Sequence, residues 1–115
     1  MTIDDLKILK LRGEKIPLIT AYDYSFARLA EMVGIDVILV GDSLGNVVLG
    51  HDTTIPVSMS DMVHHTRATA RGIQKSLLIA DMPFISYATP ADAISNAAKL
   101  MQAGAHMVKL EGGEW

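Results

Sequence analysis

Short apolar runs alternate along the chain with longer stretches in which apolar residues recur every three or four positions. The short runs predict buried strands, and the amphipathic stretches predict helices that cover them. The predicted elements, in chain order, are helix 3–11, strand 16–22, helix 24–33, strand 37–40, helix 58–71, strand 77–80, helix 89–103 and strand 106–111. This alternation is typical of parallel strands joined by crossover helices, the arrangement of α/β proteins.

Capping signals support several of these boundaries. Ser58 and Asp61 have the spacing of a capping box, and the Thr-Pro pair at 89–90 is typical of a helix start. Glycines that favour helix ends follow three of the helices: Gly34, Gly72 and Gly104. Residues 43–57 are expected to form a long loop with a short extended piece at 46–49.

Part of the pattern repeats within the chain. The segment 34–40 is similar to 104–110, and 72–80 is a looser third copy. Repeated units of a helix end and a buried strand are typical of (β/α)8 barrels and also of doubly wound sheets. The repeat alone does not separate these two folds.

Composition limits the classes of function. The chain has 115 residues, 50% of them hydrophobic, no cysteine and a net charge of −3. Disulfide and thiolate chemistry are excluded, and no basic surface for nucleic acid is expected. The apolar runs are too short to cross a membrane, and no signal peptide is visible. A complete (β/α)8 barrel needs roughly 200 residues or more, so we expect part of such a barrel at most.

Acidic residues follow three of the predicted strands. Asp42, Asp81 and Glu111 stand where strands end, and the carboxyl ends of neighbouring parallel strands meet at one edge of a sheet. Any one of them could instead cap a helix or begin a turn. Three together predict a site for a hard cation with oxygen ligands, such as Mg²⁺.

Lys109 lies inside the last strand, on the same face as Glu111 because side chains alternate. A buried lysine is costly unless it is paired. Lys109 and Glu111 could simply neutralise each other. We favour a cation that binds an anionic substrate beside a carboxylate that holds the metal.

Weaker signals surround these positions. Tyr22 and Asp23 follow the first strand and could reach the same edge, or could only begin a helix. Ser43 could offer its hydroxyl to a carboxylate, or could only cap. His64 and His65 fall within a helix, and we expect them to have surface or packing roles.

Five motifs occur in the order of a known enzyme family: Thr20–Phe26, Val40–Gly45, Gly50–Thr54, Ala80–Phe84 and Val108–Glu114. Together they resemble those of the ketopantoate hydroxymethyltransferases. The resemblance implies a (β/α)8 TIM barrel of the phosphoenolpyruvate/pyruvate type with an N-terminal helix. Residues 1–115 would be the N-terminal half of this single domain, with only its first four strands.

The resemblance also implies a function. The family transfers a hydroxymethyl group from 5,10-methylenetetrahydrofolate to 3-methyl-2-oxobutanoate, giving 2-dehydropantoate in pantothenate biosynthesis. Its members use Mg²⁺, are cytoplasmic and commonly form decamers. A chain that is only half of the barrel would be inactive without a complementing C-terminal half. Two alternatives stay open: another Mg²⁺-dependent lyase or aldolase of 2-oxo acids, and a non-catalytic half barrel that binds a partner chain.

Site residues carry over by motif. The metal region would comprise Asp42, Asp81 and Glu111, and the 2-oxo acid would contact Asp42, Ser43, Asp81 and Lys109. The catalytic base of the family is a glutamate on a later strand, and no residue of this chain occupies its motif.

Overall fold

The computed structural model describes residues 1–113, and Glu114 and Trp115 lie outside the described residues. Its elements are α1 (Ile3–Leu11), β1 (Leu18–Thr20), α2 (Tyr24–Met32), β2 (Val37–Val40), α3 (Leu44–Val47), α4 (Met59–Arg71), β3 (Leu77–Asp81), α5 (Pro90–Gln102) and β4 (Met107–Lys109). The predicted alternation of strands and helices is confirmed. α3 is an additional short helix that the sequence pattern did not predict.

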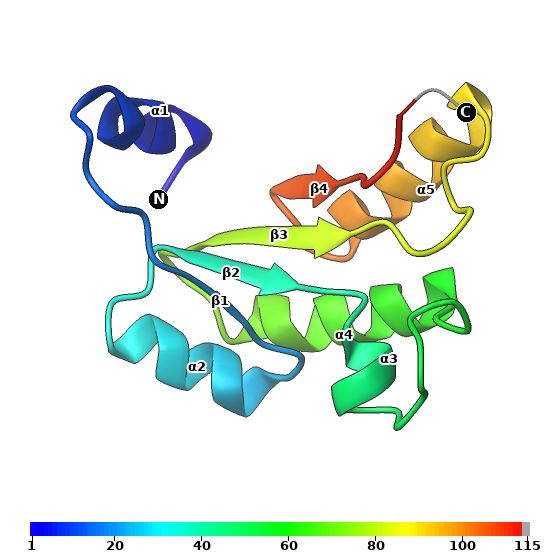
Figure 1. Cartoon of the computed structure of the whole chain (residues 1–115). Coiled ribbons are helices and arrows are strands. Elements are labelled where there is room, and N and C mark those ends of the chain that lie inside the picture. The colour runs from blue at the N-terminus through cyan, green and yellow to red at the C-terminus, as the bar shows by residue number, and fades with distance from the viewer. Residues whose placement is uncertain (114–115) are drawn as a thin grey trace.

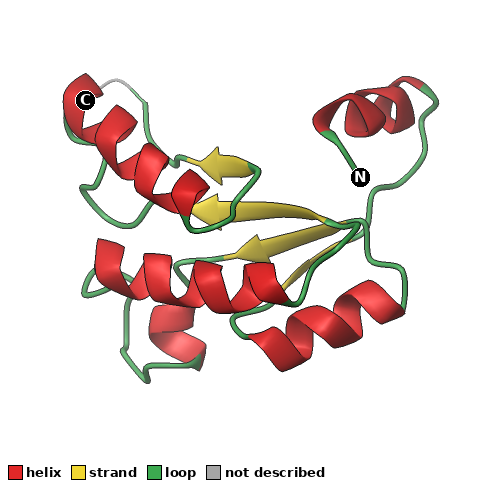
Figure 2. Ribbon diagram, turned by 180° about the vertical axis from the view of Figure 1, so that it is seen from behind, coloured by secondary structure: helices red, strands yellow, loops and turns green. Residues whose placement is uncertain are grey.

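The strands form one parallel sheet in the order β1-β2-β3-β4. Helices α2, α4 and α5 lie together on one side of it, in front of the strands in Figure 2. The first helix, α1, lies instead beyond the amino ends of the strands (Figure 1). Parallel strands with helices on one face are the layers of part of a (β/α)8 barrel, whose helices form the outer ring.

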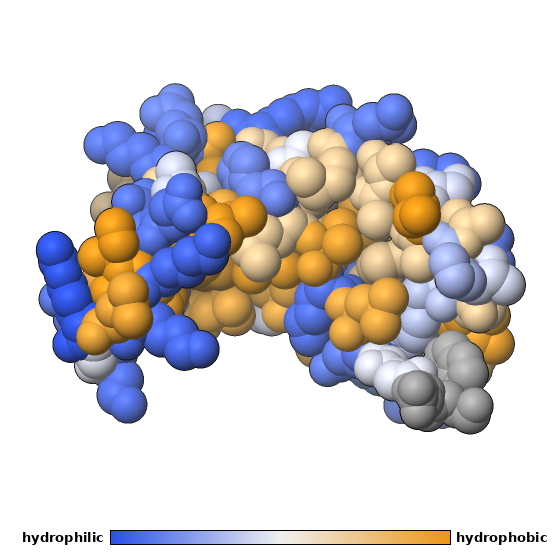
Figure 3. Space-filling model, turned by 90° about the horizontal axis from the view of Figure 1, so that it is seen from above, coloured by the Kyte–Doolittle hydropathy of each residue, from blue (hydrophilic) through white to orange (hydrophobic). Residues whose placement is uncertain are grey.

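The core lies between the sheet and these helices. Ile38 and Val40 of β2 and Leu78 and Ala80 of β3 are fully buried there. Leu39 is only partly buried, and its side chain points to the face of the sheet opposite that of Ile38 and Val40. Hydrophobic residues gather across the middle of the molecule in Figure 3, with hydrophilic residues around them.

The helix starts follow their capping signals. Thr2 with Asp5 and Ser58 with Asp61 form capping boxes at α1 and α4. Of the glycines expected at helix ends, Gly34 and Gly104 adopt positive φ angles of 86° and 120°. Gly72 stays right-handed at φ −86°; a side chain there would press on α2, because its Cβ would lie 2.7 Å from the Tyr24 carbonyl oxygen.

A carboxylate holds the loop that enters β3. Glu31, near the end of α2, accepts hydrogen bonds from the backbone N–H groups of Gln74, Lys75 and Ser76. Burial acts to raise the pKa of Glu31, but these donors lower it more, so the pKa lies below its ordinary value. Glu31 therefore stabilises this loop as an ionised carboxylate.

The prediction of a short extended segment at 46–49 is wrong. The backbone turns into α3 there, with N–H groups of Asn46 and Val47 donating to the Ser43 carbonyl. Leu44 is fully buried and anchors this turn to the core. Burial of the Leu44 side chain thus compensates for the weak helix propensity of this glycine-containing segment.

The outer strands are shorter than predicted. β1 has three residues where the pattern gave 16–22, and β4 has three where it gave 106–111. Each outer strand pairs on one side only within the described chain, so fewer of its residues are held in a ladder. None of the helices formed by residues 1–113 has the length and apolar character that a bilayer crossing requires.

Candidate active site at the carboxyl ends of the strands

Asp81 and Lys109 are the last residues of β3 and β4, and they are partners in the sheet register. Lys109 Nζ lies 2.8 Å from Asp81 Oδ1. Strand alternation places both side chains on the face of the sheet opposite the helices. The Asp81 side chain is only 7% exposed, so its charge depends on partners inside the protein.

The turn after β2 supplies the second partner. The backbone N–H of Asp42 donates to Asp81 Oδ2 at 3.0 Å. A Cβ at the preceding Gly41 would lie 2.8 Å from Ser43 Oγ, so a side chain there would displace that hydroxyl, and 3.5 Å from Asp81 Oδ2, an ordinary contact distance. Both oxygens of Asp81 are therefore held, one by each neighbouring strand.

Glu111 also contacts the lysine. Lys109 Nζ lies 3.3 Å from Glu111 Oε1, and the Glu111 side chain is 70% exposed. The pairing of Lys109 with Glu111 that the sequence left open is therefore present. It does not stand alone, because the shorter contact of Lys109 is with Asp81.

Burial and the neighbouring charges raise the pKa values of Asp42 and Lys109 in different ways. Burial raises the pKa of Asp42, and the negative charges of Asp81 and Glu111 raise it further. Lys109 and a hydrogen bond from the Thr54 hydroxyl only partly offset this. Burial acts to lower the pKa of Lys109, but the contacts with Asp81 and Glu111 outweigh it and the pKa is raised. Lys109 is thus a fixed cation within an excess of negative charge.

Ser43 lies beside these charged residues, and its neighbour is Tyr22, which was a weak candidate from the sequence. The Tyr22 hydroxyl is 2.7 Å from Ser43 Oγ. Asp23, the other weak candidate, caps α2 by accepting from the N–H of Phe26. Of the pair after β1, Tyr22 reaches the strand ends and Asp23 begins the helix.

His65 was expected to have a surface or packing role, and that expectation was incomplete. Its Nδ1 lies 2.7 Å from the backbone carbonyl oxygen of Tyr22. The contact joins α4 to the end of β1 across a long stretch of sequence, so no local pattern could have revealed it. His64, the adjacent residue, is exposed and lines a groove instead.

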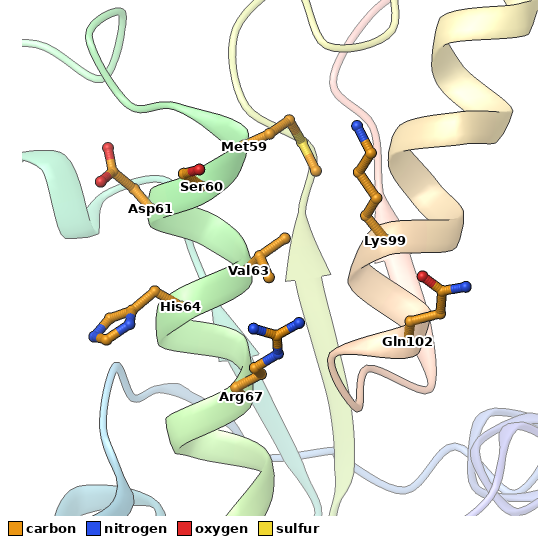
Figure 4. A pocket seen from close by; sticks show the side chains of 8 residues that line it. All are labelled: Met59, Ser60, Asp61, Val63, His64, Arg67, Lys99 and Gln102. Atoms are coloured by element: carbon orange, nitrogen blue, oxygen red, sulfur yellow. The ribbon is translucent and has the colours of Figure 1, made fainter.

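That groove lies between α4 and α5 and encloses about 680 Å³. Figure 4 shows Val63 and Arg67 of α4 and Lys99 and Gln102 of α5 on its two sides. It runs along the helical layer, away from the carboxylates at the strand ends. The clustered acids, and not this groove, mark the candidate site.

The acids do not by themselves form a three-ligand metal site. Among residues 1–113, no three Asp, Glu or His side chains lie close enough together to hold one ion. Mg²⁺ is commonly held by only one or two carboxylates, with substrate and water completing its octahedron. Asp42 and Asp81 fit that type of site, because burial and the charge of Asp81 raise the pKa of Asp42 and a bound cation would offset both effects.

Comparison with known proteins decides the family. The family model of ketopantoate hydroxymethyltransferase matches residues 1–115. This chain belongs to the ketopantoate hydroxymethyltransferase family. It is 60% identical to 3-methyl-2-oxobutanoate hydroxymethyltransferase of Shewanella loihica and 56% identical to that of Marinobacter nauticus, over 115 residues in each case. All of this chain but only 44% of each relative is covered, so the chain spans less than half the length of these hydroxymethyltransferases.

Solved structures confirm the fold that the family resemblance implied. A phosphonopyruvate hydrolase in complex with oxalate and Mg²⁺ superposes with a TM-score of 0.76 at 22% identity, over 94% of this chain and 38% of that one. A 2,3-dimethylmalate lyase of the PEP mutase/isocitrate lyase superfamily gives 0.70 at 17% identity, over 93% of this chain and 38% of that one. The four strands and their helices therefore have the fold of part of a TIM barrel, and the doubly wound alternative is set aside.

Proposed function

We propose that this chain provides the part of a ketopantoate hydroxymethyltransferase that binds the metal and the 2-oxo acid. Asp42 and Asp81 would hold Mg²⁺, and Glu111 would act at the edge of the metal region, through water. Ser43 and Lys109, with Asp42 and Asp81, would contact 3-methyl-2-oxobutanoate. The observation that carries the proposal is the contact of Lys109 with the buried carboxylate of Asp81, beside Asp42, at three adjacent strand ends.

The charges of these residues suit an anionic substrate. Lys109 keeps its proton because Asp81 and Glu111 flank it, so it offers a permanent positive charge at the mouth of the site. Its side chain is 39% exposed, which leaves the ammonium accessible to a ligand. Oxalate and Mg²⁺ bound together in the related hydrolase support a similar pairing of a small dianion and a metal here.

Bound Mg²⁺ would supply Lewis acidity, which stabilises negative charge on the keto oxygen when carbon 3 loses its proton. The protein groups would do the rest: Lys109 balances the substrate carboxylate, and Ser43 hydrogen-bonds it. A new bond would then join carbon 3 to the one-carbon unit of 5,10-methylenetetrahydrofolate. Water supplies the hydroxyl oxygen, and tetrahydrofolate leaves.

The base that removes the carbon 3 proton has no counterpart in residues 1–115. We therefore propose that residues 1–115 by themselves bind substrate without turning it over, and that turnover needs the C-terminal half of the barrel. A cytoplasmic, decameric assembly of the family type and a role in pantothenate biosynthesis belong to the same proposal.

Calorimetry tests the binding site. Titration of the chain with 3-methyl-2-oxobutanoate in the presence of Mg²⁺ should give saturable binding, and Asp81→Asn should abolish it. Asp4→Asn is the matched control, because Asp4 lies on an exposed face of α1. Absence of binding, or equal binding by Asp81→Asn, would leave the non-catalytic half barrel as the better reading.

A turnover assay separates the two enzyme classes. The chain mixed with the C-terminal half of the Shewanella relative should consume 3-methyl-2-oxobutanoate only when methylenetetrahydrofolate is present. Consumption without folate would favour a lyase or aldolase. Robust turnover by the chain alone would contradict the proposal that the base lies elsewhere.

A further inference from the structure

Three residues, one on α4 and two that follow β1 and β2, form a hydrogen-bonded series that ends at the candidate site. His65 on α4 contacts the Tyr22 backbone carbonyl at 2.7 Å, and the Tyr22 hydroxyl contacts Ser43 Oγ at 2.7 Å. Tyr22 stands just after β1, and Ser43 just after β2. The series therefore ties the ends of two adjacent strands to the helix behind them.

The hydroxyl of Ser43 is not used by the helix that it precedes. Ser43 occupies the N-cap position of α3, yet its side chain makes no capping hydrogen bond. Its Oγ instead lies where a Cβ on Gly41 would meet it at 2.8 Å, toward the strand ends. The capping role that the sequence left open is thus excluded, and the Tyr22 hydroxyl is the partner of Ser43.

The directions of these hydrogen bonds follow from the atoms. A carbonyl oxygen only accepts, so His65 donates from Nδ1–H to Tyr22. Between Tyr22 and Ser43, the phenol is the more acidic hydroxyl and the better donor. When Tyr22 donates, the hydrogen of Ser43 is free to point at another acceptor.

We propose that Tyr22 is a positioning residue that orients the Ser43 hydroxyl toward the carboxylate of the 2-oxo acid, and that His65 holds Tyr22 in place. This rests on the proposed function, since it takes Ser43 as a substrate contact. Tyr22 packs against the buried core, so its ring is already fixed before a ligand arrives. A preordered donor spares the ligand the cost of ordering Ser43 on binding.

A double-mutant cycle tests the role of Tyr22, with the affinity for 3-methyl-2-oxobutanoate and Mg²⁺ measured by calorimetry. Tyr22→Phe removes only the hydroxyl and should weaken binding about five- to tenfold, the value of one hydrogen bond. Ser43→Ala should weaken it by a similar factor. The double variant should bind no more weakly than Ser43→Ala, because Tyr22 acts through Ser43. Tyr24→Phe is the matched control, since the Tyr24 side chain is 52% exposed, and should not change affinity.

Substitutions of His65 test the other end of the series. His65→Asn keeps a side-chain N–H near the position of Nδ1 and should bind as the unsubstituted chain does. His65→Ala should resemble Tyr22→Phe, while His64→Ala should have no effect. Urea unfolding midpoints of all variants show whether a change in affinity reflects lost structure.

Three results distinguish the possible failures. Normal affinity of Tyr22→Phe, or losses that multiply in the double variant, would overturn the positioning role while Ser43 remains a contact. Normal affinity of Ser43→Ala and of Lys109→Met would overturn the proposed function, and the positioning role with it. Equal weakening by His65→Asn and His65→Ala would remove His65 from the series.

Discussion

Replacing Lys109 by Met should destabilise the chain through Asp81 rather than through the lysine itself. Methionine keeps most of the length and apolar volume of the side chain but removes the ammonium. Asp81 Oδ1 then loses its 2.8 Å partner, while Oδ2 keeps the N–H of Asp42. A carboxylate that is 7% exposed is left with half of its hydrogen-bond partners.

The size of the effect follows from the burial of the two groups. Removing one partner of a fully buried ion pair costs about 3–5 kcal/mol, and exposed pairs contribute about 0–1 kcal/mol. Asp81 belongs to the first class, but Lys109 is 39% exposed and water can reach the vacated position. We therefore expect a loss of about 2 kcal/mol, which lowers the melting temperature of a chain of this size by about 8 °C.

Thermal and urea unfolding at pH 7 measure this loss. Lys7→Met is the matched control, because Lys7 pairs with Asp4 at 3.4 Å with both side chains largely exposed, and its melting temperature should not change. Adding Asp81→Asn to Lys109→Met should restore most of the stability, since no buried charge is then left unpaired. An unchanged melting temperature for Lys109→Met, or a double variant less stable than the single one, would show that Asp81 does not depend on Lys109.

Three further substitutions and the addition of Mg²⁺ should have measurable effects. Glu31→Gln should lower the free energy of unfolding by about 1–3 kcal/mol at pH 7. Because folding lowers the pKa of Glu31, this difference should shrink as the pH falls below the ordinary pKa of 4.5. Urea unfolding at several pH values measures it. Gly41→Ala should cost about 1 kcal/mol by the same assay, since its methyl group would lie 2.8 Å from Ser43 Oγ and turn this hydroxyl away from Tyr22. Mg²⁺ at ten times its dissociation constant should stabilise the chain by about 1.4 kcal/mol in thermal unfolding. Asp42→Asn should remove that gain.

The sequence predicted best what local chemistry determines. The capping box of Ser58 and Asp61 predicted the start of α4, because both hydrogen bonds join residues three apart. The continuous apolar runs predicted β2 and the core of β3, since a strand covered by neighbours must be apolar. Helix α3 carried no such signal: Ser43 makes no capping bond there, and one buried leucine holds the turn.

The candidate site was predictable to the extent that strand position determines it. Asp42 and Asp81 were singled out because strand ends meet at one edge, and Lys109 because a lysine inside a buried strand needs a partner. Their contacts follow both expectations. The contact of His65 with Tyr22 was not predictable, since it depends on how α4 packs beside β1. Local patterns do not encode such packing between elements distant in sequence.

The strand order has a consequence for how the molecule is made. Each strand pairs with the one synthesised before it, so a nascent chain finds a partner edge already outside the ribosome. At about 5–20 residues per second, β3 emerges seconds after β2, and β4 follows last. Asp42 and Asp81 can therefore meet before Lys109 has emerged from the ribosome. Lys109, the cation that pairs with Asp81, therefore reaches this group after both carboxylates.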